Sequence, residues 1–160
     1  MTADIFVKFD SVKGESQDNV YKDAIDVLSW GWSLSQSGNT HTGGGGGAGK
    51  VSVQDLSFVK QIDKATPVLG QMCCDGTHFK EASLVMRKAG KEALEYYRVT
   101  MKKGLISSIS KGASKGEDMP TEQVTLNFEE YKEEYTPQKE DGTGDAAVES
   151  AWNMAQNKAP

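Results

Sequence analysis

The chain contains little cysteine, histidine or proline. Of its 160 residues, two are cysteine, two are histidine and four are proline. Cys73 and Cys74 are adjacent, a geometry that disfavours a disulfide between them, and we expect both to be buried free thiols. His78 alone cannot complete a zinc site with them. The sequence therefore predicts neither a metal centre nor a bound cofactor.

Long apolar runs and an excess of basic charge are also missing. No segment approaches the roughly 18 apolar residues of a membrane span, and Met1 to Asp4 contain no basic leader. The net charge of −5 argues against nucleic acid, because phosphate binding needs clustered lysine and arginine. The lysines at Lys111 and Lys115 are flanked by acids, so we interpret them as a solvated loop.

Hydrophobic residues make up only 37% of the chain, below the roughly 45–50% that is usual when glycine is also counted. This predicts one domain over residues 1–160 with a thin core and solvent on more than one side of a sheet.

A run of glycines resembles a phosphate-binding loop. Residues Gly44 to Lys50 read G-x-x-x-x-G-K, but Val51 stands where that loop needs serine or threonine to bind Mg²⁺. The alternating residues that follow predict a strand, whereas the loop must lead into a helix. We therefore interpret the run as a flexible connection between two strands.

The strand before this connection has two unlike faces. Its even positions, Leu28, Trp30, Trp32 and Leu34, form a heavy apolar face that we expect to anchor the core. Its odd positions carry only serine and glycine. Such a small face indicates either that another segment passes close by or that the backbone is exposed to solvent.

The rest of the sequence is mostly alternating. Strands are expected over 5–9, from 24 onward, over 51–59, 82–88 and 93–109, over 121–135 with a bulge near Glu129 and Glu130, and around Trp152. One helix is expected over 67–74, with Thr66 as N-cap and Gly76 as its stop. The expected core anchors are Trp30, Trp32, Phe58, Leu126 and Phe128. This predicts a mainly β fold, a compact β-barrel or sandwich with one short flanking helix.

No set of residues satisfies the requirements of an active site. Neighbouring residues of a strand point to opposite faces, so Glu129 and Glu130, like Glu133 and Glu134, cannot converge on one substrate. We expect them to protect a sheet edge. His41 is expected in an exposed loop and His78 in capping or packing, with no nucleophile signature near either. The sequence therefore predicts that the chain is not an enzyme.

Several segments, taken together and in order, resemble the hemolysin-coregulated protein (Hcp) family, the tube protein of type VI secretion systems. They are Val12 to Ser16, Ile25 to Gly38 with Trp30-x-Trp32, the glycine run into Val51, Val53 to Phe58, Asp63 to Pro67, Arg87 to Gly90, Glu122 to Phe128, Tyr135 to Lys139, and Trp152-Asn153.

The resemblance implies a β-barrel that assembles into hexameric rings. It also implies that rings stack into a tube inside a contractile sheath, tipped by a valine-glycine repeat spike protein, with effector proteins carried in the lumen. Such a protein is made in the bacterial cytoplasm without a signal peptide and is secreted outside or into target cells. The alternative is a secreted effector or toxin in its own right.

Two site hypotheses follow from the resemblance. The first is that Ser29, Gly31 and Ser33 line the lumen, the alternative being that this face packs under a loop. The second is that the glycine loop orders against the next ring, the alternative being a dispensable linker. The residues of this expected ring-stacking loop are His41, Gly43, Gly44, Gly45, Gly46, Gly47 and Gly49.

Overall fold

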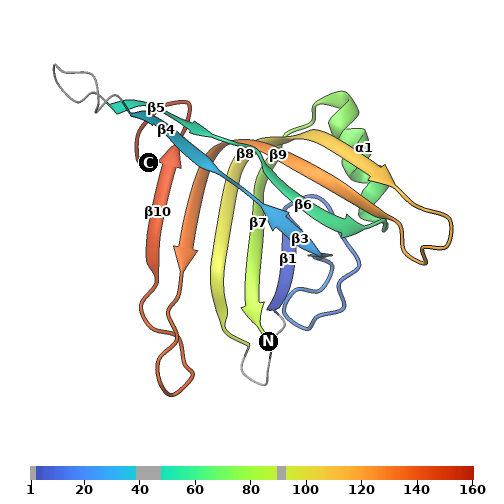
Figure 1. The fold of residues 1–160 in the computed structure, drawn as a ribbon, viewed down its shortest axis with the longest axis horizontal. Helices are drawn as coiled ribbons and strands as arrows, with labels where there is room; N and C mark the ends of the chain where they lie inside the picture. The colour runs from blue at the N-terminus through green and yellow to red at the C-terminus, as the bar shows by residue number, and fades with distance from the viewer. Residues whose placement is uncertain (1–2, 39–47, 90–92) are drawn as a thin grey trace.

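A computed structural model describes residues 3–38, 48–89 and 93–160 of the chain. These ranges contain mainly strands and one short helix, as expected (Figure 1). In chain order the elements are β1 (Ala3–Phe9), β2 (Ile25–Asp26), β3 (Ser29–Gly31), β4 (Leu34–Gly38), β5 (Ala48–Val53), β6 (Leu56–Gln61), α1 (Ala65–Asp75), β7 (Phe79–Lys88), β8 (Glu95–Gly112), β9 (Thr121–Tyr135) and β10 (Val148–Asn153).

The main sheet is antiparallel and curls until its two ends meet. Its strand order is β2-β1-β7-β8-β9-β6-β3, and β10 pairs with β9 as well. The chain between β2 and β3 joins the ends, because Val27 N–H donates to Ile5 O (3.0 Å) and Leu28 N–H donates to Val59 O (2.8 Å). The structure therefore confirms the expected fold class as a curled antiparallel sheet with a flanking helix.

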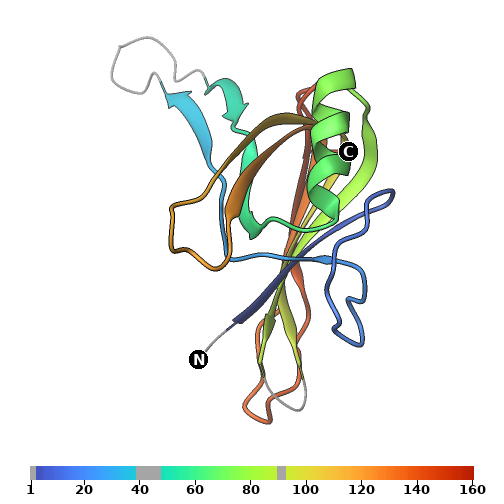
Figure 2. The same cartoon turned by 90° about the vertical axis from the view of Figure 1, so that its right-hand side faces the viewer.

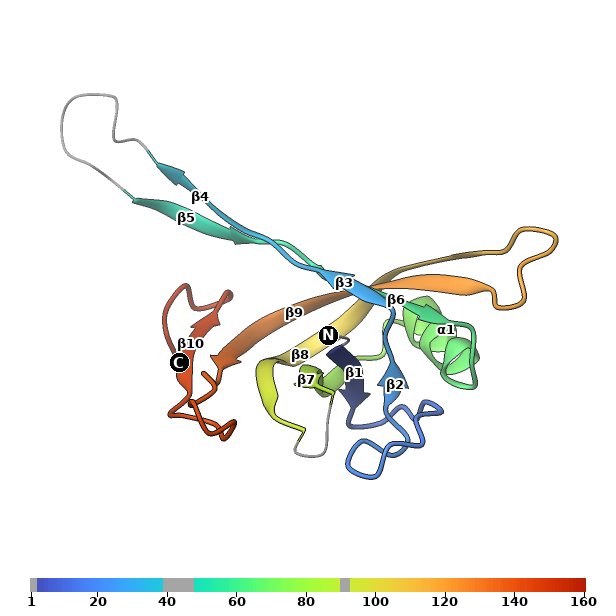
Figure 3. The same ribbon diagram turned by 60° about the horizontal axis from the view of Figure 1, so that its bottom comes forward.

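The strand expected to run on from residue 24 is instead broken into β2, β3 and β4. β4 and β5 form a separate two-stranded sheet that projects from the body as an arm (Figure 3). Leu28 and Leu34, expected in the core, are exposed. Leu28 lies in the crossing between β2 and β3, and Leu34 lies at the start of the arm, where the chain leaves the curled sheet. Likewise, the strand expected over 51–59 is divided into β5 in the arm and β6 in the body.

The core lies inside the curl. Three expected anchors, Phe58, Leu126 and Phe128, are buried. Trp30 and Trp32 are half-buried at its margin, where they pack against the same cluster. Trp30 stacks on Tyr97 with ring centroids 5.5 Å apart, and Trp32 meets Tyr131 edge-on at 4.8 Å.

β8 and β9 change face together where they bend. The buried phase shifts between the pair Gly104–Phe128 and the pair Met101–Tyr131, which lie three residues apart on each strand. Because both strands carry an extra residue, their pairing register continues through the bend. The bulge expected near Glu129 and Glu130 is thus a kink shared by two strands.

The expected role of the glutamates as edge charges is wrong. β9 has neighbours on both sides here, since Glu130 pairs with Lys102 of β8 and with Asn153 of β10. Lys132 lies among the glutamates, with its Nζ 3.7 Å from Glu134 and 3.5 Å from Glu149. The acidic run is therefore part of a charged cross-strand ladder.

The helix begins earlier than expected and is capped differently. Its N-cap position is Lys64, and Asp63 Oδ1 accepts a hydrogen bond from Ala65 N–H (2.9 Å). The expected N-cap, Thr66, lies inside the helix. Gly76 ends the helix with a left-handed φ of 70°, as expected. Figure 2 shows α1 against the body on the side away from the arm.

Two expectations near the helix are corrected. Cys74 is exposed and Cys73 half-buried, because only one side of α1 packs against the core. His78 is also exposed, since it lies in the short connection between α1 and β7, and it neither caps nor packs within the described residues.

Candidate functional site

The outward side chains of β3, β6, β9 and the end of β8 form one surface without charged residues, which we call the neutral face. Strand pairing arranges it in three rows. The rows are Gly31, Ser57, Thr125 and Ser108; then Ser29, Val59, Gln123 and Ser110; and then Gln61, Thr121 and Gly112. The opposite faces of these strands carry Leu56, Phe58, Val124 and Leu126, all fully buried.

The structure brings two of the expected lumen residues together with others that the sequence analysis missed. Ser29 and Gly31 are exposed members of the neutral face. Ser33 is exposed as well, but it lies beyond β3, at the start of the arm. The missed residues alternate with core residues on β6 and β9. The alternation could have identified them as outward residues of their strands. It could not show that these strands lie in the same sheet as β3.

The neutral face can form hydrogen bonds but has no titratable side chain. Serine and threonine hydroxyls and glutamine amides each donate and accept. A Cβ at Gly31 would have only Ser57 Oγ within contact distance, at 3.9 Å. The surface is therefore shallow and open at this point, and suited to contact rather than to acid–base chemistry.

A hydrogen-bond cluster fixes one border of the neutral face. The register of β8 and β9 shifts between Ile106 and Ser108, so Ser107 is an extra residue. Its Oγ donates to Asp55 Oδ2 (2.8 Å), and Asn127 Nδ2 donates to Asp55 Oδ1 (2.8 Å). These bonds hold the bulge against the start of β6 and give each carboxylate oxygen of Asp55 a hydrogen-bond donor.

A buried ion pair lies directly behind the neutral face. Lys60 and Glu122 pair across β6 and β9, with Nζ and Oε1 2.6 Å apart and both side chains fully buried. Lys60 also contacts Asp63 Oδ1 (2.7 Å), and Thr66 Oγ1 donates to Glu122 Oε1 (2.8 Å). The cluster therefore joins both strands to the first turn of α1.

A second ion cluster holds the connection between β1 and β2. Arg87 donates to Asp18 (2.5 and 3.0 Å) and to Asp4 (3.0 Å), and its guanidinium lies 5.1 Å from the centroid of Phe6. The hydrogen bonds from Arg87 hold the pKa of Asp18 well below its usual range. Tyr21 from the same connection stacks on Phe6 at 4.8 Å.

The expected ring-stacking loop falls mostly outside the described residues. His41, Gly43, Gly44, Gly45, Gly46 and Gly47 all lie there. Gly49 is described and lies in β5 of the arm, where a Cβ would come within 2.2 Å of Ser37 Oγ on β4. Close packing of the two arm strands therefore favours glycine at this position.

The described residues offer neither a metal centre nor a helix that spans a membrane. No group of histidine, cysteine and carboxylate side chains there is placed to hold a metal ion. No helix in the same ranges is long and apolar enough to cross a membrane. The site thus offers a neutral binding surface backed by ion pairs.

The curled, mainly β sheet with its neutral outer face and projecting arm offers surfaces for contact and no arrangement suited to acid–base chemistry. The family model described as "Type VI secretion system effector, Hcp" matches residues 6–135. Protein hcp1 of Pseudomonas aeruginosa is 54% identical over 159 residues, covering 98% of each chain. The chain therefore belongs to the Hcp family, and it is a type VI secretion tube protein.

Solved structures agree with this assignment. The crystal structure of Hcp1 from Salmonella typhimurium is 37% identical and covers both chains fully, with a TM-score of 0.83. The structure of another type six secretion system protein reaches a TM-score of 0.93 at 26% identity, covering 99% of this chain and 100% of the other. The family consists of structural secretion proteins and not of enzymes, which confirms the expectation that the chain is not an enzyme.

Proposed function

We propose that six copies of this chain form a ring whose lumen is lined by the neutral face, and that such rings stack into the secreted tube. The contiguous rows of uncharged, outward side chains carry this proposal. The wall of a lumen must form hydrogen bonds with water and must also leave room for cargo to pass. Small hydroxyl-bearing residues provide hydrogen bonds without long side chains that would narrow the passage.

The proposed partners are other copies of the chain, a contractile sheath around the tube, a valine-glycine repeat spike protein at its tip, and effector proteins in the lumen. The subunit would be made in the bacterial cytoplasm and leave through its own secretion apparatus, outside or into a target cell. Family membership and the likeness to hcp1 of Pseudomonas aeruginosa support this assignment.

Negative-stain electron microscopy of the purified protein tests the ring. Uniform six-fold annuli are expected. Compact particles of about monomer size would contradict ring formation and turn attention to an independent effector.

Substitution of Gly31 by tryptophan tests the lumen assignment. The open space at Gly31 lets the variant fold and form rings, while the indole obstructs the neutral face. We expect annuli that no longer retain effector proteins in co-purification. Gly70→Trp is the matched control, because Gly70 lies on α1 with nothing within 4 Å of its Cβ position, and it should retain effectors. Unchanged retention by Gly31→Trp rings would contradict the lumen placement.

We also propose that the arm of β4 and β5, whose strands residues 39–47 join in sequence, contacts the next ring. The support is its projection away from the main sheet (Figure 3). Shortening the segment between Gly38 and Ala48 should leave single hexamers intact but weaken stacking and secretion. Normal tubes after this deletion would favour the alternative, a dispensable linker.

A further inference from the structure

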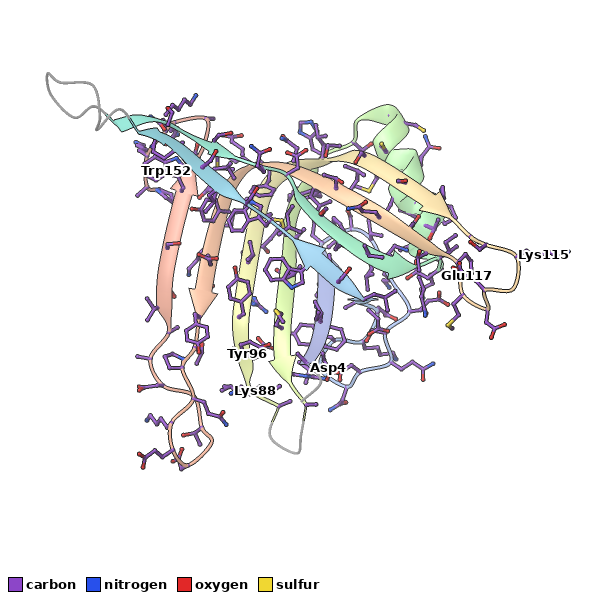
Figure 4. All side chains as sticks on the ribbon, in the orientation of Figure 1. Asp4, Lys88, Tyr96, Lys115, Glu117 and Trp152 are labelled. Carbon is purple, nitrogen blue, oxygen red and sulfur yellow. The ribbon has the colours of Figure 1, made fainter. Side chains whose placement is uncertain are left out.

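A pocket of about 420 Å³ lies on the outward face of β1, β7 and the start of β8, where the β1–β2 connection forms one of its walls. None of its lining residues belongs to the neutral face. Figure 4 shows Asp4, Lys88 and Tyr96 at one end of the molecule, where β1 begins, β7 ends and β8 begins, and the three strands run side by side from there. The pocket is therefore a second outward surface, separate from the proposed lumen.

Strand pairing sets the order of the polar side chains in the pocket. Lys8 of β1 pairs with Ser83 of β7, and Arg98 of β8 lies one row nearer the start of its strand. In the other direction, Asp10 N–H donates to Glu81 O (3.2 Å), so these two acids share the next row. Rows on one face of a sheet are about 7 Å apart. The pocket thus runs from a basic end to an acidic end.

The charged groups toward the acidic end have no charged partner. No ion pair among the described residues includes Lys8, Asp10 or Glu81, although Lys102 lies opposite Glu81 on β8. Asp10 and Glu81 are like charges opposite each other on neighbouring strands, an arrangement that destabilises a sheet. A cation bound between them would remove this cost.

An aromatic ring forms a fixed wall of the pocket. Tyr21 is 4% exposed, stacks on Phe6 with ring centroids 4.8 Å apart, and donates a hydrogen bond from its hydroxyl to Glu95. Next to this contact, Arg98 Nη2 lies 3.4 Å from Tyr21 Oη and 3.8 Å from Glu95 Oε2. Because both contacts are long, Arg98 retains N–H groups that can donate to a ligand. Val20, beside Tyr21, adds an exposed apolar side chain to the wall.

We infer that this pocket binds an ω-amino carboxylate, a group whose carboxylate and ammonium are separated by a chain of methylenes. The carboxylate accepts charge-assisted hydrogen bonds from Arg98 and Lys8. The ammonium lies between Asp10 and Glu81, one row further along. The methylene chain packs against the ring of Tyr21 and loses its contact with water. A free lysine-like amino acid and the carboxy-terminal lysine of a peptide both have this chemistry.

The opposite charges of the two ends favour such a ligand over simpler ones. A ligand with a carboxylate alone would leave Asp10 and Glu81 uncompensated and would be repelled by them. A ligand with an ammonium alone would leave Arg98 and Lys8 without an anion. Only a ligand with both charges, held apart by an apolar spacer, satisfies both ends and the wall between them.

Isothermal titration calorimetry of the purified, assembled protein tests the inference with matched small molecules. The main probe is 6-aminohexanoate; hexanoate and hexylamine each keep one of its charges, and glycine keeps both without the spacer. We expect 6-aminohexanoate to bind at least about tenfold more tightly than any of these controls, because a hydrogen bond to a charged group contributes at least such a factor. No binding of 6-aminohexanoate, or equal affinity for the controls, would overturn the inference.

A double variant tests the acidic end. Asp10→Asn/Glu81→Gln changes two exposed side chains that take part in no ion pair among the described residues, so the fold is retained. It should lose the preference for 6-aminohexanoate over hexanoate. Glu140→Gln/Asp141→Asn is the matched control, because it removes the same charge from an exposed loop outside the pocket, and it should bind like wild type. An unchanged preference in the pocket variant would contradict the assignment of the ammonium.

Lys8→Gln tests the basic end in the same way. Lys8 is exposed, and its loss should reduce the preference for 6-aminohexanoate over hexylamine. Lys80→Gln is the control, since Lys80 is an exposed lysine of β7 that does not line the pocket. Equal binding by these two variants would contradict the assignment of the carboxylate. Urea unfolding of each variant shows whether a change in binding reflects a change in fold.

Free L-lysine and a short peptide ending in lysine distinguish the two sources of the ligand. Tighter binding of the peptide assigns a protein carboxy terminus, because the α-ammonium of free lysine would lie next to Lys8 and Arg98. Tighter binding of free lysine assigns a diamino acid. The same peptide with a carboxy-terminal amide should bind at least about tenfold more weakly than the peptide acid. If the amide binds as well as the acid, and free lysine binds no better than hexylamine, the carboxylate contributes nothing and the inference is overturned.

Discussion

Lys60 and Glu122 face each other across β6 and β9 with their charged atoms 2.6 Å apart and no exposed surface on either side chain. Removing one member of a buried pair leaves the other charge without compensation, which destabilises a protein by about 3–5 kcal/mol. We therefore expect Lys60→Met to lower the free energy of unfolding by that amount in urea titrations. The double variant Lys60→Met/Glu122→Leu should recover most of the loss, because it removes both charges of the pair and leaves neither buried without its partner.

An exposed pair provides the control for this experiment. Lys132 lies 3.5 Å from Glu149, and both side chains are solvent-accessible. Such pairs contribute less than about 1 kcal/mol, so Lys132→Met should change stability little. Equal losses from Lys60→Met and Lys132→Met would show that burial does not set the strength of the Lys60 cluster.

The Arg87–Asp18 contact predicts a pH-dependent contribution to stability. The folded state lowers the pKa of Asp18 through hydrogen bonds from Arg87, so the stabilisation is present above the unfolded pKa of 3.8 and is lost as pH falls toward the lower folded value. Asp18→Asn should therefore be less stable than wild type at pH 7. The difference should shrink progressively below about pH 4.

Asp26 provides a contrast of opposite sign. Burial raises its pKa, with further contributions from Asp18, Asp4 and Asp63, so its charged form opposes folding at neutral pH. Asp26→Asn should accordingly increase stability at pH 7, and chemical denaturation across a pH series measures both variants together. A pH-independent loss in Asp18→Asn would mean that Asp18 acts through shape and not through charge.

The sequence predicted the bounds of strands and of the helix better than it predicted which elements lie side by side. Alternation located β9 within its full bounds, and Gly76 marked the end of α1, because both features depend on local residues. Alternation also places Lys60 on the same face of β6 as the buried Leu56 and Phe58. The alternation of one strand cannot show that Glu122 of β9 lies opposite Lys60 and compensates its buried charge. That contact joins strands far apart in sequence.

The neutral face shows the same limit. Ser29 and Gly31 were recognisable as a small, outward face from the strand that contains them. Ser57 and Thr125 were not, since their part in the face depends on β6 lying between β3 and β9. The edge role expected for Glu133 and Glu134 failed for a related reason: only the pairing of β10 with β9 reveals that this segment is internal.

Gly104 should tolerate no side chain at the bend of β8. A Cβ there would lie 2.2 Å from Phe79 Cζ and 2.4 Å from Asn127 O, and the backbone oxygen cannot move without disturbing the β8–β9 pairing. Overpacking of this kind costs about 1–3 kcal/mol, so Gly104→Ala should lower the thermal midpoint clearly. Gly112→Ala on the same strand is the matched control, because nothing lies within 4 Å of its Cβ position. Equal midpoints for the two variants would refute the close approach at Gly104.

Salt should strengthen the stacking of rings. In the proposed hexamer, six copies at −5 each give the ring a formal charge of −30, so neighbouring rings repel unless counterions screen them. Raising the salt concentration from about 0.05 to about 0.5 M shortens the screening length several-fold and should lengthen the stacks seen by electron microscopy. Glu140→Gln reduces the charge to six copies at −4, which is −24, and should shift stack formation to lower salt. Stacks that shorten as salt rises would show instead that attractive ion pairs between rings outweigh their net repulsion.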